Sequence, residues 1–432
     1  MADSSHSNLQ SADSKSGPLS GVTVLELGSF IAGPFAGQLL GDYGAEVIKI
    51  EPPISGDPMR KWGVLRDEHS LWWPSIARNK RSVCVDLRVE QGRNVIRRLA
   101  QGCDIVIENF RPGRLETWGL GFSELSKVNP RLIMVHVSGF GQTGPKAKSA
   151  GFGSIGEAVG GIRYSTGTPE APPSRTGISL GDSLAGMFSV VGALAALTEA
   201  RSTGKGQEVD VAIYEAVAAL MESSMADYEL GGVMRERSGG ILTGVAPSNA
   251  YPTKDGSDVV IAANADSVFT RLCQTMGQPE LATDPRFDSH IRRGQNMAEI
   301  DALVTQWTRT KNADELLSQL ETSGVPAGKI FTARDMLNDD HYAAREMVMR
   351  RTSEQGWELP MPGVVPKFSK TPGTVRSVGP LLGADTRDVL ERIAKMGASE
   401  VDALEADGTL YCGKADDESS KSVHDHRTGD LT

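Results

Sequence analysis

The sequence has little of what disulfide, metal or histidine chemistry requires. Its four cysteines lie far apart in 432 residues and never form a C-x-x-C pair, which argues against a disulfide scaffold and a zinc ribbon. The seven histidines include no H-x-x-x-H or H-E-x-x-H spacing, so no metal site is predicted. His136 stands inside an apolar stretch and is interpreted as a core residue.

Positive charge is also scarce. Lysine and arginine together number 45 against 55 aspartate and glutamate residues, which gives a formal net charge of −10. A protein that binds nucleic acid needs a basic face to displace counterions, so nucleic acid is not expected as a partner. An anionic small molecule is compatible with this charge if basic residues gather locally.

Long apolar runs are missing from the sequence. The longest, from Leu184 to Leu197, is rich in alanine and glycine and is shorter than a membrane span, so no membrane association is expected. Residues 1–17 contain neither the apolar core of a secretory signal nor the arginines of a mitochondrial presequence. Together with the dispersed cysteines, these features predict a cytoplasmic location.

Apolar strands alternate with helices through the first part of the chain. Strands are predicted at 22–28, 45–51, 82–87, 104–109 and 131–139, with helices at 33–44, 90–101 and 113–128 between them. Near-continuous apolar strands separated by helices are typical of a parallel sheet covered on both faces. The predicted fold is therefore α/β, with a doubly wound parallel sheet in a large domain.

The pattern changes after Gly231, where glycine-rich and polar residues replace this alternation. Residues 249–263 predict two strands joined at a Lys-Asp-Gly hairpin turn, and helical patterns follow at 266–276, 295–309 and 312–322. These elements predict a smaller α+β domain. The full division is a disordered tail 1–17, the large domain 18–230, a glycine-containing linker 231–245, the small domain 246–335, a return to the large domain 336–410, and a disordered tail 411–432.

The first strand-to-helix turn, residues 28–34, does not fit a dinucleotide site. Its glycines are Gly28 and Gly33, and Phe30 stands where the G-x-G-x-x-G motif has its middle glycine. That glycine allows the backbone to approach a pyrophosphate. Nicotinamide or flavin binding is therefore not predicted at this turn.

Two basic segments are better candidates for an anion site. Residues 77–88 carry four basic side chains and one acid. Residues 108–114 bring an asparagine and two arginines to the end of a predicted strand. Open α/β sheets bind ligands at this edge, and arginines suit phosphates. Together the segments predict a ligand with several phosphates; a solvated basic turn is the alternative for each.

Asp182 lies between Gly181 and Ser183, at the start of a run of small and apolar residues. As a structural residue it would cap a helix by accepting hydrogen bonds from first-turn amides. The same amides would also keep its carboxylate ionised. An ionised and accessible aspartate is a nucleophile that needs no base when the leaving group is good, as the thiolate of a thioester is. Both interpretations are open.

Seven motifs occur in order along residues 18–389: LSGVTVLELGSFIAGPFAGQLLGDYGAEVIKIEPP, GDPMR, RNKRSVCVDLR, IENFRPG, SGFGQTGP, LGDSLAGM and YPTKDG. With these motifs the sequence resembles the class III CoA-transferases, the family of formyl-CoA transferase and carnitine CoA-transferase. The resemblance implies an interlocked homodimer, in which each chain forms a ring threaded by the other. It also implies acyl-CoA and a small carboxylate as substrates, with no permanently bound cofactor.

The resemblance implies roles for individual residues. Asp182 would be the catalytic nucleophile, which attacks an acyl-CoA thioester and passes through a mixed anhydride and an aspartyl-CoA thioester. The family's glycine loop, which shields the anhydride from water, maps onto Gly239 and Gly240, although the family's loop is longer. The family's CoA-binding segments map onto Val85, Arg88, Asn109, Phe110 and Arg111.

The motifs are most similar to relatives that move CoA from succinyl-CoA to a small dicarboxylate such as malate, citramalate, itaconate or 3-hydroxy-3-methylglutarate. The carboxylate that does not react needs a cation. Arg175, which precedes Asp182 by seven residues, is the predicted partner. Arg60 and Arg163 are the alternatives.

Three other interpretations of function are kept. A formyl-CoA/oxalate-type or carnitine-type CoA-transferase would use the same aspartate on other substrates. An acyl-CoA racemase shares the fold, but it carries a histidine in a G-H-D motif where this chain has Gly151-Phe152-Gly153, and so its base is missing here. A non-catalytic CoA-binding homologue would not need an intact Asp182.

Overall fold

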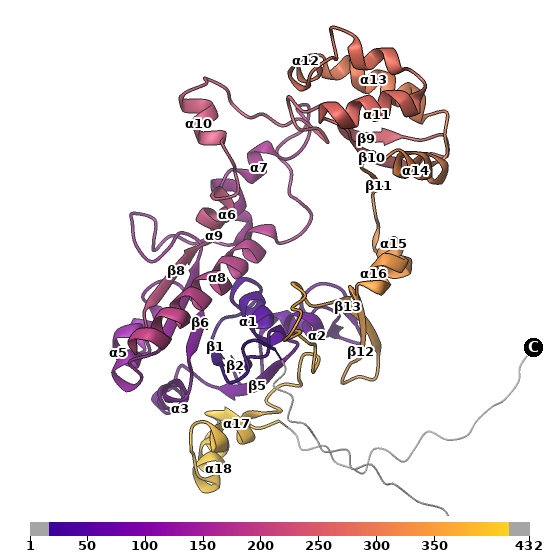
Figure 1. The fold of residues 1–432 in the computed structure, drawn as a ribbon. Helices are drawn as coiled ribbons and strands as arrows, with labels where there is room; N and C mark the ends of the chain where they lie inside the picture. The colour runs from indigo at the N-terminus through magenta and orange to yellow at the C-terminus, as the bar shows by residue number, and fades with distance from the viewer. Residues whose placement is uncertain (1–16, 414–432) are drawn as a thin grey trace, which may run out of the picture. The chain divides into compact units, whose positions relative to one another are not determined.

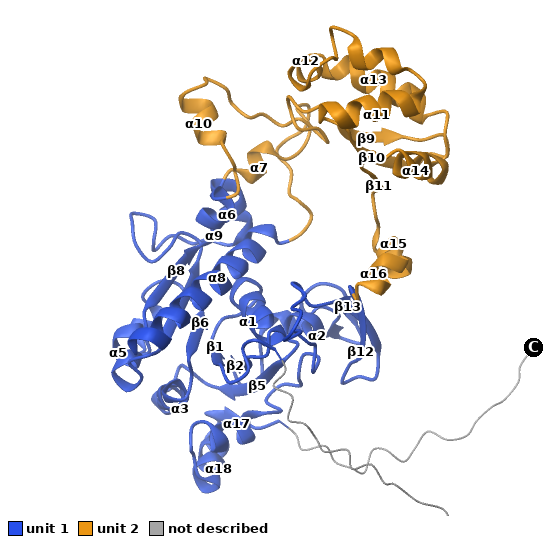
Figure 2. Ribbon diagram, in the orientation of Figure 1, with its two compact units in different colours: residues 1–160, 179–219, 347–432 blue, residues 161–178, 220–346 orange. Residues whose placement is uncertain are grey.

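The computed structural model describes residues 17–413, and the chain divides into two compact units (Figure 1, Figure 2). Unit 1 comprises residues 1–160, 179–219 and 347–432, and unit 2 comprises residues 161–178 and 220–346. The predicted tails lie outside the described residues, apart from Gly17 and residues 411–413. The predicted small domain, 246–335, lies within unit 2, and its boundaries stay predictions.

Unit 1 is built on a seven-stranded sheet with the strand order β14-β5-β2-β1-β6-β7-β8. Only β14 runs antiparallel to its neighbour, which confirms the predicted α/β class with a mainly parallel sheet. The strands are β1 Thr23–Glu26, β2 Glu46–Glu51, β5 Lys80–Val85, β6 Ile105–Glu108, β7 Ile133–Ser138, β8 Glu208–Ala212 and β14 Leu410–Tyr411. Two hairpins, β3 Leu65–Arg66 with β4 His69–Ser70 and β12 Val348–Thr352 with β13 Glu358–Pro362, complete the strands of this unit.

Helices cover both faces of this sheet (Figure 1). On one face α1 packs against α8, and on the other α3, α5, α17 and α18 enclose a hydrophobic core. The helices pack on the sheet because each has an apolar face. In α3, Val95, Ile96 and Leu99 are buried against the sheet, while its arginines lie on the outer side. The helices are α1 Ala32–Asp42, η1 Pro58–Lys61, α2 Trp73–Ile76, α3 Glu90–Gln101, α4 Arg114–Thr117, α5 Phe122–Val128, α6 Gly153–Val159, α8 Leu180–Thr203, α9 Ile213–Ala218, α17 Thr386–Arg392 and α18 Ala398–Ala406.

The chain reverses its direction of travel across the sheet at β1. From β1 it proceeds to β2 and then β5 on one side, and it returns to β6 on the other side of β1. The carboxyl ends of β1 and β6 therefore form the topological switch point, where open α/β sheets bind their ligands. The turn after β1 and the residues after β6 are the segments at this point.

The apolar run 184–197, which was expected to be too short for a membrane span, is part of a longer helix, α8. Over Leu180–Thr203 it has 24 residues and a mean hydropathy of 1.6 in its most apolar window, which is enough to cross a membrane by length and composition. Half of that window is buried inside the protein. A Cβ on Gly186 would lie 2.9 Å from the Ala32 carbonyl oxygen, so the helix approaches α1 closely, as a core helix does.

Unit 2 contains a three-stranded antiparallel sheet, β11-β10-β9, with helices packed on it. The predicted hairpin is confirmed by the pairing of β9 with β10. The helix predicted at 295–309 is confirmed as α13, and the structure adds a short helix, α12, just before it. The elements are α7 Ile162–Ser165, α10 Ser224–Glu229, β9 Ser248–Pro252, β10 Asp258–Ala262, α11 Asp266–Met276, η2 Pro279–Thr283, α12 His290–Gln295, α13 Met297–Thr308, α14 Ala313–Thr322, β11 Ala327–Lys329, α15 Ala333–Asn338 and α16 Asp340–Ala344.

Candidate active site

Asp182 is the third residue of α8, in its first turn, and its side chain is half-buried. The N-cap is Ser179, so the interpretation of Asp182 as the helix cap is wrong. The unpaired amides at the N-terminus of a helix favour a negative charge in the first turn. The position therefore stabilises an ionised carboxylate without using it as the cap.

Gly153, the first residue of α6, lies directly against this carboxylate. A Cβ at residue 153 would be 2.7 Å from Asp182 Cγ and 3.0 Å from its Oδ1, so a side chain there and the observed position of Asp182 exclude each other. Glu157, one turn further along α6, is 1% exposed, and its Oε1 accepts a hydrogen bond from the Gly181 N–H at 3.3 Å. α6 thus fixes the start of α8 and the place of its aspartate.

At the switch point Asn109 joins the ends of β6 and β1. Its Oδ1 accepts a hydrogen bond from the Ser29 N–H at 2.8 Å, and its Nδ2 donates to the Ser29 carbonyl at 2.7 Å. Gly28 makes room for this amide, because a Cβ there would lie 2.9 Å from Asn109 Oδ1. Both ends of the asparagine amide are therefore occupied in shaping the turn after β1.

Phe110 and Arg111 follow Asn109 at the same edge of the sheet. The Phe110 ring is partly buried and meets the Trp118 ring edge-on, with 5.5 Å between centroids. Arg111 is exposed, and the Arg114 guanidinium lies 5.4 Å from the centre of the Trp118 ring. An aromatic surface flanked by two arginines suits a base and its phosphates.

The backbone of Phe110 is tied to a buried pair behind it. Its N–H donates to Glu108 Oε2 at 2.7 Å, and Glu108 Oε1 lies 2.6 Å from His136 Nδ1. Burial raises the pKa of Glu108. Burial alone would lower the pKa of His136, but its contact with the Glu108 carboxylate raises it overall. The interpretation of His136 as a satisfied core residue is confirmed.

The basic segment 77–88 is mostly not an anion site. Arg78 is buried on Asp42, with 2.6 Å from Nη2 to Oδ2. Lys80 is buried on Glu26 at 2.8 Å. The phosphate-binding role predicted for these two residues is wrong, and so is the alternative of a solvated basic turn for them. The charges serve as internal ion pairs that link β1, α1 and β5.

Arg88 is the most exposed of the four basic side chains in this segment. Its side chain is 84% exposed, and its Nη2 lies 2.7 Å from Asp86 Oδ2, a contact that lowers the pKa of Asp86. Val85 is 1% exposed and its side chain faces the core. β2 and β1 separate β5 from β6, so Arg88 and Arg111 follow strands about 14 Å apart, three strand spacings. Their roles in CoA binding stay predictions.

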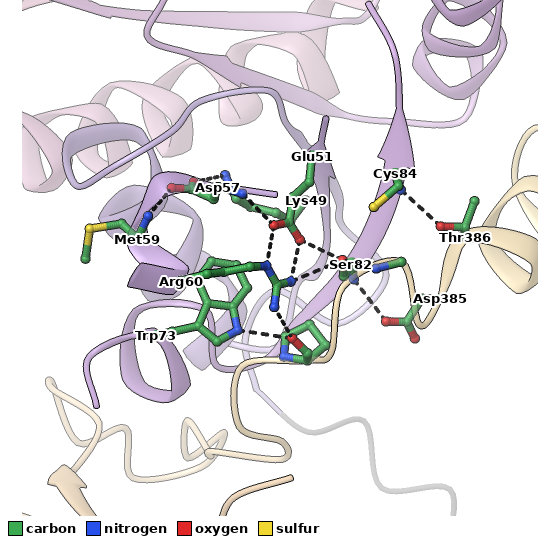
Figure 3. A network of polar contacts seen from close by, with 12 residues as sticks. Lys49, Glu51, Asp57, Met59, Arg60, Trp73, Ser82, Cys84, Asp385 and Thr386 are labelled. Carbon is green, nitrogen blue, oxygen red and sulfur yellow. Dashed lines mark hydrogen bonds and ion pairs between the residues drawn. The ribbon is translucent and has the colours of Figure 1, made fainter. Parts of the chain in front are cut away.

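Arg60 is committed to the interior of unit 1 (Figure 3). Its Nε and Nη2 each lie 2.7 Å from a Glu51 carboxylate oxygen, and its Nη1 donates to the Pro380 carbonyl at 3.0 Å. The guanidinium also lies 3.9 Å from the centre of the Trp73 ring. The prediction of Arg60 as a partner for the dicarboxylate is therefore wrong.

The remaining predicted residues belong to unit 2. Arg175 is exposed in a segment without helix or strand, and Arg163 lies half-buried in α7. Gly239 and Gly240 are exposed, and the Gly239 N–H donates to the Gly167 carbonyl at 2.9 Å. The structure thus brings the predicted glycine loop beside residues 163–168 of the same unit.

Glycine-rich patterns elsewhere lack the context that their chemistry needs. Residues 177–181 match the G-x-S-x-G pattern of hydrolase nucleophile elbows, which requires a strand before the serine. Residues 172–178 form no helix or strand, and Ser179 is the N-cap of α8. Residues 139–144 and 151–156 match G-x-G-x-x-G, but the first precedes no helix directly and the second follows no strand.

Sequence reasoning missed Gly153 and Glu157. Each contacts the start of α8 from a helix more than twenty residues earlier in the chain. No spacing rule predicts such a contact, because it depends on how α6 and α8 pack.

Asn109→Ala is expected to weaken CoA binding by about tenfold, because it releases both backbone groups of Ser29 and loosens the turn at the switch point. The affinity for CoA, measured by isothermal titration calorimetry, checks this. Arg131→Ala, an exposed change at the opposite end of the sheet, is the control. An unchanged affinity in Asn109→Ala would remove Asn109 from the site.

Comparison with known proteins agrees with this geometry. The family described as CoA-transferase family III matches residues 19–386 of the chain. The chain belongs to CoA-transferase family III. A class III CoA-transferase uses a CoA thioester as substrate, and the family match includes Asp182 and both segments at the switch point.

Individual relatives of this family III member are similar over most of their length. Succinyl-CoA--D-citramalate CoA-transferase of Chloroflexus aurantiacus is 55% identical over 390 residues, which are 90% of this chain and 97% of that protein. The alpha subunit of succinyl-CoA--L-malate CoA-transferase of Chloroflexus aurantiacus is 40% identical over 90% of this chain and 91% of its own. A solved CAIB/BAIF family protein from Brucella suis superposes with a TM-score of 0.77 at 34% identity, covering 88% of this chain and 100% of that one.

Proposed function

We propose that the protein transfers CoA from succinyl-CoA to a small dicarboxylate, citramalate or malate being the first candidates. The observation that supports this most is the 55% identity to a succinyl-CoA--D-citramalate CoA-transferase across 97% of that relative. The place of Asp182 in the first turn of α8 supports its proposed role as the nucleophile.

The proposed reaction is an exchange through the Asp182 carboxylate. The carboxylate attacks the thioester carbonyl, giving a mixed anhydride and CoA thiolate. The thiolate attacks the aspartyl carbonyl, releases succinate and leaves an aspartyl-CoA thioester. The acceptor carboxylate then displaces the thiolate to form a second anhydride. The thiolate finally attacks the acceptor's carbonyl, which yields the new acyl-CoA and regenerates the carboxylate. One thioester replaces another, so no ATP is required.

For CoA itself we propose the switch point of the sheet as the site. Phe110 would lie against the adenine, Asn109 would shape the turn, and Arg111 and Arg88 would meet phosphates, while Val85 would contribute only backbone because its side chain faces the core. Gly239 and Gly240 would cover the anhydride. A polyphosphate ligand spans the separation between β5 and β6 more readily than a small anion does.

The assembly that we propose is a homodimer. Two of the malate relatives are named alpha and beta subunits. The described cysteines are all free thiols, which fits the reducing cytoplasm that we propose as the location.

A racemase is the second candidate because its relatives share the fold. Where a racemase carries a histidine, this chain has Phe152, and the next residue is Gly153, which lies against Asp182. The motif therefore lacks the racemase's base, which favours transfer. Oxalate-type and carnitine-type transfer would use the same Asp182 with another acceptor.

The test is a CoA-exchange assay with succinyl-CoA and a panel of acceptors. D-citramalate, L-malate and itaconate are expected to accept CoA and acetate is not, because acetate lacks the second carboxylate. Arg175→Ala is expected to reduce the preference for dicarboxylates, with Arg163→Ala as the alternative. Oxalate with formyl-CoA tests the other transferase classes. The acyl-CoA is also incubated in deuterated water without any acceptor. Deuterium found at its α-carbon would show that the protein is a racemase and would contradict the proposed transfer.

A further inference from the structure

The turn between β1 and α1, residues 27–31, is held by buried charge. Lys49 of β2 has a side chain that is 1% exposed, and its ammonium donates to the Gly28 carbonyl. The same ammonium lies 2.7 Å from Asp57 Oδ2 and 3.2 Å from Glu26 Oε1. The Lys49 ammonium is therefore buried against the backbone of this turn and is not solvated at the surface.

Asp57 contacts the same turn at Phe30. It precedes η1, is 2% exposed, and its Oδ1 accepts hydrogen bonds from the Phe30 N–H at 3.2 Å and the Met59 N–H at 2.8 Å. Its N–H donates to Glu51 Oε2 at 2.9 Å, so Asp57 is anchored to the Glu51 and Arg60 network (Figure 3). Two oppositely charged side chains thus contact successive parts of one turn.

The turn carries backbone strain that these contacts hold in place. Phe30 has a φ of +64°, the left-handed region, which a bulky side chain adopts rarely and at a cost in free energy. The Phe30 ring also meets the Trp62 ring edge-on at 5.7 Å. Strain of this kind persists only where the surrounding groups fix the conformation, and Asp57 binds the N–H of the strained residue itself.

Both partners are charged at neutral pH. Burial opposes the charged form of Lys49, but Asp57 and Glu26 outweigh it and raise its pKa. Burial likewise opposes ionisation of Asp57, but Lys49 and the two N–H groups hold its pKa below the usual value. A full ion pair is therefore maintained at this position.

Stability does not account for a buried ion pair at this place. Removing two charges from water costs about as much as their attraction returns, and apolar replacements of equal volume are often neutral or stabilising. The location does provide a reason, because the turn lies at the switch point and Asn109 binds it from β6. The ion pair and the asparagine grip the same three residues, 28–30.

We propose that Lys49 and Asp57 are positioning residues for CoA binding, which hold the backbone of residues 28–30 in the shape that receives the thioester substrate. They act through the turn and contact no substrate. This inference rests on the proposed CoA-transferase function.

The test compares Asp57→Asn and Asp57→Ala with a matched control, Asp42→Asn. The asparagine at 57 retains an oxygen for the Phe30 N–H but loses the charge that faces Lys49, whereas alanine loses both. Asp42 is an equally buried carboxylate, 2.6 Å from Arg78 Nη2 and 2.8 Å from Asn79 Nδ2. Asp42 is the last residue of α1, near the amino end of β2, whereas the switch point lies at the carboxyl ends of the strands.

The melting temperature Tm, the Kd for CoA by calorimetry, and kcat and KM for succinyl-CoA are measured well below the lowest Tm. All three variants are expected to lower Tm. Asp57→Asn is expected to raise Kd and KM by about tenfold, equivalent to about 1.4 kcal/mol, and Asp57→Ala by more. Asp42→Asn is expected to leave both constants at the wild-type value.

The outcomes separate this inference from the function beneath it. If Asp42→Asn raises Kd as much as Asp57→Asn, the ion pair is merely structural and the inference fails. The inference also fails if wild type exchanges CoA and Asp57→Ala retains its Kd. If wild type neither binds CoA nor exchanges it, the proposed function fails instead.

Discussion

Asp182→Ala is expected to lower kcat for CoA exchange by a factor on the order of 10⁴ or more, with little change in the Kd for CoA. The reason is chemical, because without the carboxylate no mixed anhydride forms and the thioester has no route to the acceptor. α8 should remain intact, since Ser179 and not Asp182 is its N-cap and alanine favours helix.

The covalent intermediate provides the sharper measurement. Wild-type protein is incubated with succinyl-CoA in the absence of an acceptor, treated with hydroxylamine, and analysed by intact mass and peptide mapping. A hydroxamate on Asp182, missing from Asp182→Ala, is expected. Activity of Asp182→Ala equal to that of wild type would return the aspartate to a structural role, and a hydroxamate on another carboxylate would assign the nucleophile elsewhere.

Gly153→Ala is expected to lower kcat by about 10²-fold, because a displacement of a reacting group by about 1 Å has an effect of that size. The new Cβ would lie 2.7 Å from Asp182 Cγ, so the two groups must separate. The carboxylate is the end of a flexible side chain, and it yields more readily than the backbone of α6. The expected cost therefore falls on catalysis, with Tm nearly unchanged.

Gly186→Ala is the matched control for this variant. It also adds a Cβ to a helix, but this Cβ lies on α8, 2.9 Å from the Ala32 carbonyl oxygen, where backbone must move. Its expected cost is a lower Tm with normal kcat for the folded fraction. Two results would contradict the proposed effect of Gly153 on the Asp182 carboxylate. One is a wild-type kcat in Gly153→Ala. The other is a lower kcat that the unfolded fraction of the variant fully explains.

Local patterns predicted those parts of the fold that depend on neighbouring residues. α3 spans Glu90–Gln101 and α11 spans Asp266–Met276, the ranges that their apolar periodicity predicts. The hairpin of β9 and β10 followed from its turn residues. The ends of α9 and α10, two short helices that follow β8, were not predicted, because tertiary packing decides where weakly patterned helices end.

The use of each charge could not be predicted from local composition. Arg78 and Lys80 are conspicuously basic in the sequence, yet each has its acid on another element, Asp42 of α1 and Glu26 of β1. Such partners become visible only when the sheet is assembled. Asn109 was predicted as a CoA contact from the family resemblance. Its hydrogen bonds to Ser29 could not be predicted, because they depend on the pairing of β1 with β6.

The antiparallel edge strand β14 has a consequence for how the chain is made. β5 receives its second neighbour from Leu410–Tyr411, and the Ser82 and Cys84 N–H groups donate to Asp385 and Thr386. All of these partners emerge from the ribosome more than 290 residues after β5. Throughout synthesis of unit 2, the nascent sheet therefore presents β5 as an open edge, the kind of edge that recruits foreign strands. Synthesis of residues 385–411 is what closes it.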